Sequence, residues 1–217
     1  MKKLILSFLL TVMPVIGLAA GGGVQLDDAD IDLTDQASLQ HGAKLFMNYC
    51  LSCHSAKYQR YNRMARDLGL TEEEVKDNLM FTTDKIGDTM NIAMNPADAE
   101  KWFGVAPPDL SVIARARGVD WIYTYLRRFV PDEKRPFGVN NTVFPDVGMP
   151  HVLWKLQQDQ PADKFDSDMR DLTAFLSYIS EPIQVERQRL GVWVLLFIAV
   201  FFVLAYLLKK EYWKDIH

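Results

Sequence analysis

All of the cysteine in this sequence lies in one pentapeptide. Cys50 and Cys53 are the only two cysteines among 217 residues, and His54 follows them directly. Cys-x-x-Cys-His is typical of c-type haem attachment. Two thiols at this spacing can bond the two vinyl groups on one porphyrin edge, and the next residue is then carried beneath the ring. We therefore predict one covalently bound haem c, anchored by Cys50 and Cys53, with His54 as an iron ligand.

Three other uses of a close cysteine pair explain the sequence less well. A disulfide leaves His54 without a role. A zinc site needs one or two further Cys or His ligands, and only His41, His151 and His217 remain. A redox-active thiol pair normally begins a helix within a βαβ unit, and no such pattern surrounds Cys50.

The second axial ligand decides what the iron can do. An open position permits chemistry with small molecules, whereas a methionine sulfur restricts the iron to electron transfer and raises its reduction potential relative to a second histidine. Met149 is favoured because it lies in a loop, between Gly148 and Pro150, which restrict the backbone. Met90 and Met94 come next, and Met169 falls on the apolar face of a helix. The other candidates are Met64, Met80, His41 and His151.

Apolar residues are concentrated in two blocks, one near each end. Residues 1–20 have a positive start, an apolar run and small residues, which predicts a cleaved signal peptide; an uncleaved anchor is the alternative. Residues 190–208 carry no charge and would span about 28 Å as a helix, close to the thickness of a bilayer core. We expect residues 21–182 to form a periplasmic cytochrome c domain and residues 183–217 a transmembrane anchor with a short cytoplasmic tail.

Between the two apolar blocks the pattern indicates helices and loops, with no convincing strand alternation. A helix is expected to lead into Cys50, and residues 131–162, rich in proline and glycine, are expected to form a long ordered loop. The predicted helix starts are at Thr71, Asn95, Asp109, Asp120 and Ser167, and the predicted ends are at Gly104, Pro131 and Pro182.

The net charge of −4 argues against a nucleic-acid partner. Acidic residues gather at 27–35 and at 72–74. These stretches either steer a basic protein partner or form ordinary solvated surface, and the sequence alone leaves both readings open.

Several segments in order along the chain resemble the cytochrome c1 family. They are the Cys-x-x-Cys-His motif with the following SxxYxxY, "APPDLSVIARAR" at 106–117, "VGMP" at 147–150 and "AFLSYISEP" at 174–182 before the apolar run. The resemblance covers residue 38 onward. It implies an all-α c-type cytochrome fold with a long haem-covering loop and one C-terminal transmembrane helix. It also implies that Met149 is the second axial ligand, that Arg117 contacts a haem propionate and that Pro108 belongs to the wall of the haem pocket.

The same resemblance implies the role of an electron-transfer subunit in a quinol–cytochrome c oxidoreductase. Its partners would be cytochrome b, a Rieske iron–sulfur protein, a cytochrome c acceptor and membrane lipid, within a dimeric complex of the bacterial inner membrane. The short segment after Arg117 and the compact residues 131–146 suggest a bacterial form. The alternatives are a membrane-anchored monohaem cytochrome c of another respiratory complex, and a haem enzyme or gas sensor with an open iron site.

Overall fold

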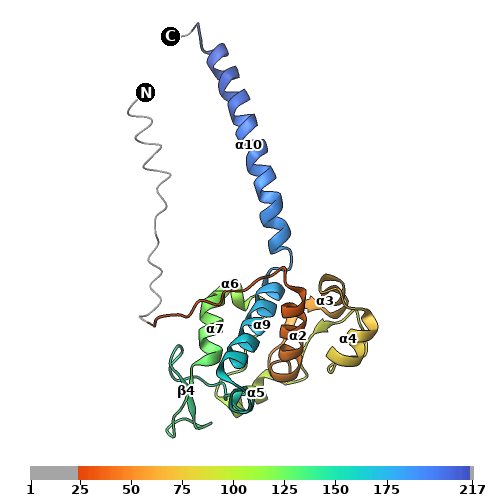
Figure 1. The fold of residues 1–217 in the computed structure, drawn as a ribbon, viewed down its shortest axis with the longest axis vertical. Helices are drawn as coiled ribbons and strands as arrows, with labels where there is room; N and C mark the ends of the chain where they lie inside the picture. Colours follow the sequence, from red (N-terminus) through yellow and green to blue (C-terminus); the bar gives the residue numbers. More distant parts are fainter. Residues whose placement is uncertain (1–23, 216–217) are drawn as a thin grey trace.

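The computed structural model describes residues 24–215, which form a mainly helical domain and one long helix that leaves it (Figure 1). The predicted signal peptide, residues 1–20, lies outside the described residues. The helices are α2 (Gln36–Tyr49), α3 (Tyr61–Asp67), α4 (Glu72–Leu79), α5 (Pro96–Phe103), α6 (Ile113–Arg117), α7 (Val119–Arg127), α8 (Trp154–Asp159), α9 (Ala162–Ser180) and α10 (Gln184–Tyr212). The strands are β1 (Ala56–Arg60), β2 (Thr89–Met90), β3 (Phe129–Pro131) and β4 (Val139–Asn141).

Helices α2 and α9 pack against each other and form the centre of the domain (Figure 1). Gly42 permits this packing, because a Cβ atom there would lie 2.1 Å from the carbonyl oxygen of Asp171 and 2.8 Å from the Cβ of Phe175. Phe46 and Phe175 meet next to this crossing, with ring centroids 5.5 Å apart, and neither is exposed. Apolar side chains from both helices therefore supply a large part of the hydrophobic core.

Several predicted helix boundaries are confirmed. Thr71 and Glu74 form a reciprocal capping box at the start of α4. The Asn95 side chain accepts a hydrogen bond from the first turn of α5, and the helix ends at Gly104 with a φ of 77°, a conformation that glycine adopts without strain. Pro182 lies in the short link between α9 and α10.

Two aspartates predicted to begin helices do not do so. Helix α6 begins at Ile113, and its N-cap makes no side-chain hydrogen bond, so Asp109 does not cap it. Asp120 lies inside the first turn of α7, where its carboxylate accepts a hydrogen bond from the Ala29 N–H at 3.0 Å. Both carboxylates bind backbone groups from distant segments, which local sequence does not reveal.

The expectation of helices and loops alone is incomplete. Strands β1 and β2 form one antiparallel pair, and β3 and β4 form another. Strand β4 and helix α8 lie within residues 131–162, which were expected to form a loop, and β3 reaches them at Pro131. Helix α9 begins at Ala162, after Pro161, and not at Ser167. Strands of two to five residues are too short for alternation to separate them from loop.

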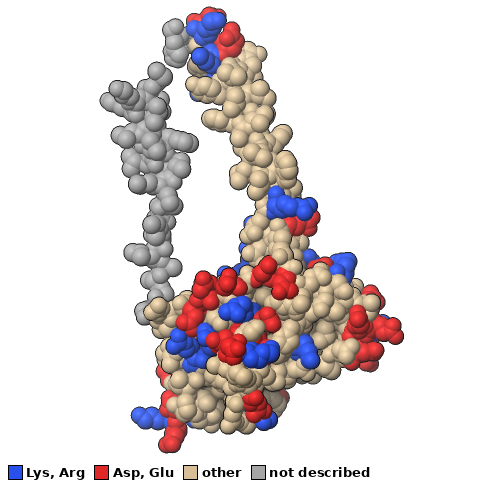
Figure 2. Space-filling view, viewed as in Figure 1, with Lys and Arg blue, Asp and Glu red and all other residues tan. Residues whose placement is uncertain are grey.

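Residues 27–29, which we call the N-terminal strap, are held against α7. Asp27 forms ion pairs with Arg127 at 2.8 Å and with Arg128 at 3.0 Å. Its N–H donates to the Thr124 hydroxyl at 2.8 Å, and the Arg170 side chain donates to the strap at the carbonyl of Ala29. Figure 2 shows acidic and basic groups interspersed on this face. The negative charge of Asp27 is therefore offset by neighbouring arginines and adds little to long-range steering of a basic partner.

Helix α10 contains 29 residues and is exposed on every side. Figure 2 shows a long uncharged middle section between charged ends. Within the described residues it is the one helix long and apolar enough to cross a membrane, and it contains the predicted span at 190–208. A helix that is apolar all round fits a lipid environment better than water.

Candidate haem-binding site

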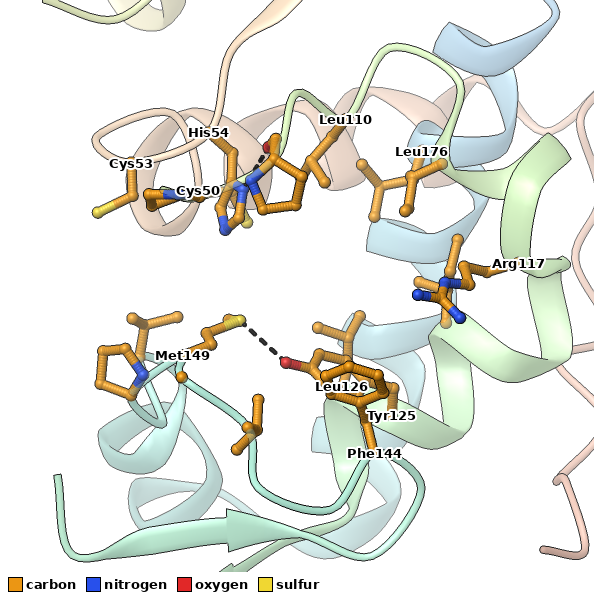
Figure 3. A pocket seen from close by; sticks show the side chains of 18 of the residues that line it. Cys50, Cys53, His54, Leu110, Arg117, Tyr125, Leu126, Phe144, Met149 and Leu176 are labelled. Carbon is orange, nitrogen blue, oxygen red and sulfur yellow. Dashed lines mark hydrogen bonds between the residues drawn. The ribbon is translucent and has the colours of Figure 1, made fainter. Parts of the chain in front are cut away.

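The structure brings the six predicted site residues to one apolar cavity. Cys50, Cys53 and His54 lie beside it after α2, Met149 lies in the loop before α8, and the segment 107–117 contributes Pro108 and Arg117. The cavity has a volume of about 360 Å³, within the roughly 300–1,000 Å³ common for cofactor pockets. Figure 3 shows His54 and Met149 on opposite sides of this cavity.

The backbone after α2 turns tightly at the two cysteines. The N–H groups of Cys53 and His54 both donate to the carbonyl oxygen of Cys50, at 3.0 and 2.8 Å. Cys50 is buried, Cys53 is partly exposed, and both are free thiols. Burial raises the pKa of the Cys50 thiol to about 12, and the neighbouring Cys53 adds to this effect. Reactive redox pairs need a lowered thiol pKa, so the site does not resemble one.

The His54 ring is fixed by the carbonyl oxygen of Pro108. The distance from Nδ1 to this oxygen is 2.7 Å, and a carbonyl can only accept, so Nδ1 carries the hydrogen. The second nitrogen, Nε2, is then left with its lone pair, on the side of the ring toward the cavity (Figure 3). Burial lowers the pKa of His54, which favours the neutral imidazole that metals bind.

The residues after Pro108 attach this segment to strand β1. The Asp109 carboxylate accepts from the N–H of Lys57 at 3.1 Å, and the Ser111 hydroxyl accepts from the N–H of Tyr58 at 3.1 Å. Asp109 also accepts from the N–H of Ser111 at 2.9 Å. The sequence Pro-Asp-Leu-Ser therefore holds in place the carbonyl group that orients His54.

The loop that carries Met149 is packed closely against α5 and α7. A Cβ atom on Gly148 would lie 3.1 Å from the carbonyl oxygen of Phe103. The two backbone segments are therefore so close that glycine is favoured at this position. The Tyr125 hydroxyl of α7 donates to the Met149 sulfur at 3.3 Å (Figure 3). Burial raises the pKa of Tyr125, so its hydroxyl stays protonated and remains a donor.

The other candidate ligands lie away from the cavity. Met64, Met90 and Met169 are fully buried in the core. His151 stacks on Phe129, and its Nε2 lies 2.8 Å from the Gln157 side chain. The cavity lining also lacks Met80 and Met94.

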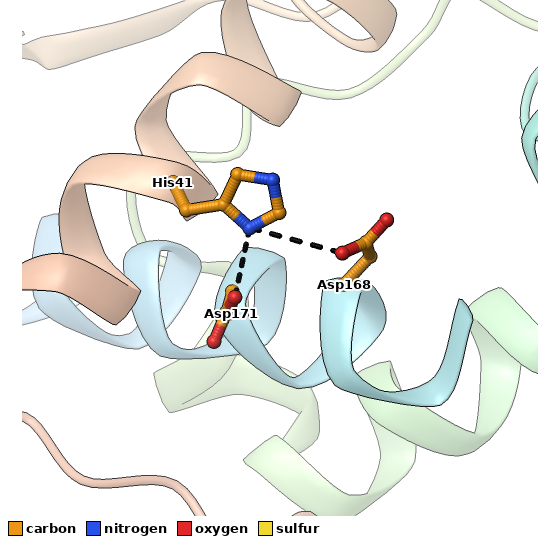
Figure 4. A group of neighbouring side chains, drawn as sticks. All are labelled: His41, Asp168 and Asp171. Carbon is orange, nitrogen blue, oxygen red and sulfur yellow. Dashed lines mark hydrogen bonds and ion pairs between the residues drawn. The ribbon is translucent and has the colours of Figure 1, made fainter. Parts of the chain in front are cut away.

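His41 takes part in a polar cluster that joins α2 to α9. Its Nδ1 lies 2.8 Å from an Asp171 oxygen and 3.8 Å from an Asp168 oxygen (Figure 4). Asp168 also pairs with Lys164, and Ser38 donates to Asp171 at 2.6 Å. Every carboxylate in this group has a protein partner, so its geometry is that of a structural link between the helices.

Arg117 lies at an exposed end of the cavity (Figure 3). Its guanidinium is 5.0 Å from the centre of the Trp121 ring and 5.6 Å from that of Phe144, both distances typical of cation–π contacts. Among residues 24–215 no carboxylate forms an ion pair with it. Arg117 is therefore available to bind an anionic group at the cavity mouth.

Sequence reasoning missed the residues of α7 and α9 that line the cavity. Trp121 and Tyr125 of α7 are four residues apart, so they share one face of that helix. Leu172 and Leu176 of α9 show the same spacing and also line the cavity. This periodicity was available from the sequence, but it does not distinguish a cofactor wall from ordinary core.

An imidazole nitrogen, an opposing thioether, two free thiols and a guanidinium around one apolar cavity fit the donors and the shape that haem c requires. Together with α10, the one helix among residues 24–215 long and apolar enough to cross a membrane, they fit the class of c-type cytochromes with a candidate membrane helix. Residues 29–216 match the Cytochrome C1 family, and the chain belongs to this family. Membership confirms the resemblance, and it implies haem c and a role in electron transfer.

Comparison with individual proteins agrees with this assignment. The chain is 51% identical to a cytochrome c1 of Allochromatium vinosum, with both chains fully covered. It is 46% identical to a protein of Nitrosomonas europaea named ammonia monooxygenase gamma subunit, over all of this chain and 98% of that one. A cytochrome c1 of Rhodospirillum rubrum is 27% identical, over 92% of this chain and 94% of that one.

Proposed function

We propose that this chain is the electron-transfer subunit of a quinol–cytochrome c oxidoreductase. It takes electrons from a Rieske iron–sulfur protein and passes them to a cytochrome c acceptor, while bond chemistry on quinol takes place elsewhere in the complex. Family membership supports this role. A Bradyrhizobium diazoefficiens relative named cytochrome b/c1 is 29% identical over 84% of this chain and 34% of its own length, which supports cytochrome b as a partner.

In this proposal Cys50 and Cys53 would bond one haem c, and His54 and Met149 would hold its iron. Pro108 supports the histidine, and Arg117 binds a propionate. The observation that carries the assignment is that an oriented imidazole and a thioether face one another across the same cavity. The haem iron supplies a one-electron redox couple when bound.

The chain's own residues keep both ligands in place. The Pro108 carbonyl fixes the ring of His54, and the Tyr125 hydroxyl holds the sulfur of Met149. Apolar side chains of α7 and α9 line the cavity and make it unfavourable for water. Ligands held in this way move little between redox states, which favours rapid electron transfer.

We further propose that residues 21–182 lie in the periplasm after removal of the signal peptide. Residues 183–217 then provide a single-pass anchor in the bacterial inner membrane with a short cytoplasmic tail, within a dimeric complex. The apolar surface of α10 supports the anchor. The orientation rests on the sequence pattern of residues 1–20.

Purification of the full chain from membranes in mild detergent tests the proposal. We expect a pigment that survives acid–acetone extraction, together with cytochrome b and a Rieske protein in the same complex. Met149→Leu should open the iron to carbon monoxide, whereas Met169→Leu, in the core, should not. A colourless product, or an unchanged Met149→Leu spectrum, would contradict the haem assignment.

A second candidate is a monohaem cytochrome of another complex. The similarity to the Nitrosomonas europaea protein named ammonia monooxygenase gamma subunit supports this second candidate. The copurified partners separate the two, since another complex would lack cytochrome b and the Rieske protein. The open-site alternative predicts that carbon monoxide binds rapidly to the unmodified reduced protein.

A further inference from the structure

We propose that Tyr125 is a positioning residue that sets the strength of the Met149 sulfur as an iron ligand and thereby raises the reduction potential. This inference rests on the proposed function, in which Met149 binds the iron. The family resemblance does not assign Tyr125 any role, and the evidence for one is its contact with the ligand itself.

The contact is a directed hydrogen bond. The Tyr125 hydroxyl lies 3.3 Å from Sδ of Met149, and a thioether can only accept. Within residues 24–215 this sulfur is the single hydrogen-bond partner of the hydroxyl. Figure 3 shows the sulfur between the Tyr125 oxygen and the His54 side of the cavity.

Neighbours on both sides fix the Tyr125 ring. Its plane stacks on Trp121 with centroids 4.9 Å apart, and Phe129 meets it edge-on at 5.3 Å. The buried Asn141 side chain donates to the Tyr125 carbonyl at 2.8 Å, which attaches this point of α7 to β4. The ring therefore has little freedom to turn its hydroxyl away from the sulfur.

The stack connects two parts of the proposed site. Arg117, Trp121, Tyr125 and Phe129 follow one another at intervals of four, and each contacts the next. Phe129 then stacks in parallel on His151, with centroids 4.7 Å apart. The stack thus runs from the proposed propionate contact to a residue two positions after Met149.

The chemical effect follows from the two lone pairs of a thioether. One is available to a metal, and the Tyr125 hydroxyl draws electron density from the other. A hydrogen bond to a ligand is a recognised means of adjusting a metal's potential. A sulfur that donates less density stabilises the oxidised iron less, so the hydrogen bond should favour the reduced state.

The test compares Tyr125→Phe with Tyr123→Phe in the purified holoprotein. Tyr125→Phe keeps the stacked ring and removes only the hydroxyl. Tyr123 lies on the same helix, but its ring contacts Arg127 and Arg170, so it is a matched control. We expect Tyr125→Phe to shift the one-electron equilibrium about threefold toward the oxidised state, which is about 28 mV, with no shift in Tyr123→Phe. Equal potentials in both variants would overturn the proposal.

A second measurement keeps the proposal testable if the Tyr125→Phe variant does not fold or take up haem. Replacing all tyrosines with 3-fluorotyrosine, a stronger donor, should raise the potential of the unmodified chain and of Tyr123→Phe. Loss of the far-red thioether-to-iron band in Met149→Leu establishes the ligand independently. If Met149→Leu keeps the band, the proposed ligand is wrong. If it loses the band while fluorination and Tyr125→Phe leave the potential unchanged, only the role of Tyr125 is wrong.

Discussion

The Nδ1 atom of His54 lies 2.7 Å from the carbonyl oxygen of Pro108, although 54 positions separate the two residues. A proline carbonyl cannot be removed by changing a side chain. The support for His54 therefore has to be tested through the residues that hold this carbonyl in place.

Asp109→Ala removes the acceptor of the Lys57 and Ser111 N–H groups. We expect a loss of about 1–3 kcal/mol in the free energy of unfolding, because these groups lose a charged acceptor. The His54 ring should also become less well fixed, giving a mixed-spin haem spectrum. Asp98→Ala, which affects only an exposed pair with Lys101, is the control and should change neither property. Identical behaviour of the two variants would mean that the segment is held by other contacts.

Arg117→Gln removes the cation at the mouth of the cavity. If Arg117 binds a propionate, the reduction potential should fall, because a nearby positive charge favours the reduced iron. Arg117→Lys should restore it only in part, since lysine lacks the bidentate geometry of arginine. Arg115→Gln alters an exposed arginine two positions away and serves as control. Redox titration measures the effect, and equal potentials in all four proteins would exclude the contact.

Gly42→Ala introduces a methyl group where α2 meets α9. The new atom would lie 2.1 Å from the Asp171 carbonyl oxygen, so the helices must separate. We expect the free energy of unfolding to fall by about 1–3 kcal/mol or more. Gly87→Ala, whose Cβ would meet no atom within 4 Å, should be nearly neutral. Chemical denaturation distinguishes the two, and a neutral Gly42→Ala would show that the helix crossing is adaptable.

The capping box at α4 predicts an acid-sensitive contribution to stability. Hydrogen bonds from the backbone and side chain of Thr71 hold the pKa of Glu74 below its ordinary value. A carboxyl group with a lowered folded-state pKa stabilises the fold above its unfolded pKa, and this contribution disappears as the pH falls through the folded pKa. Thr71→Ala should therefore be less stable than the unmodified protein at pH 7, and the difference should shrink as the pH falls below about 4.3, the ordinary pKa of a glutamate. The hydrogen bond from the Glu74 N–H to the Thr71 hydroxyl does not titrate, so its part of the difference should remain in acid.

Glu73→Gln, one position away on the same helix turn, provides the control for that experiment. It leaves the capping box intact, so its stability should follow the unmodified protein across the same pH range. Denaturant unfolding at several pH values makes the comparison. A Thr71→Ala difference that persisted undiminished in acid would show that the carboxylate of Glu74 is not its source.

The parts of the molecule that were predicted correctly depend on local spacing. Three of them involve residues close in the sequence: the helix that ends at Cys50, the capping box at Thr71 and the apolar run within α10. Met149 was favoured from its Gly and Pro neighbours, and the structure places it beside the cavity opposite His54, although its role as a ligand stays a prediction.

The features that were missed depend on contacts between distant segments. Asp109 lies where a helix cap was expected, but its carboxylate accepts a hydrogen bond from the Lys57 N–H of β1. Tyr125 and Met149 are 24 positions apart, and nothing in either segment indicates that they meet. The strands β3 and β4 have three residues each, so their pairing depends on the packing of the loop and leaves no periodic pattern.

Only residues 181–183 separate α9 from α10, and Pro182 stiffens this link. Arg187, in the first turns of α10, forms an ion pair back to Glu181. Since Leu172 and Leu176 of α9 line the cavity, its wall is joined almost directly to α10. In the proposed function α10 is the membrane anchor, so a change in its tilt would be passed through this short link to the haem-binding domain. The domain would then have little freedom to swing, and a redox partner would have to travel to it.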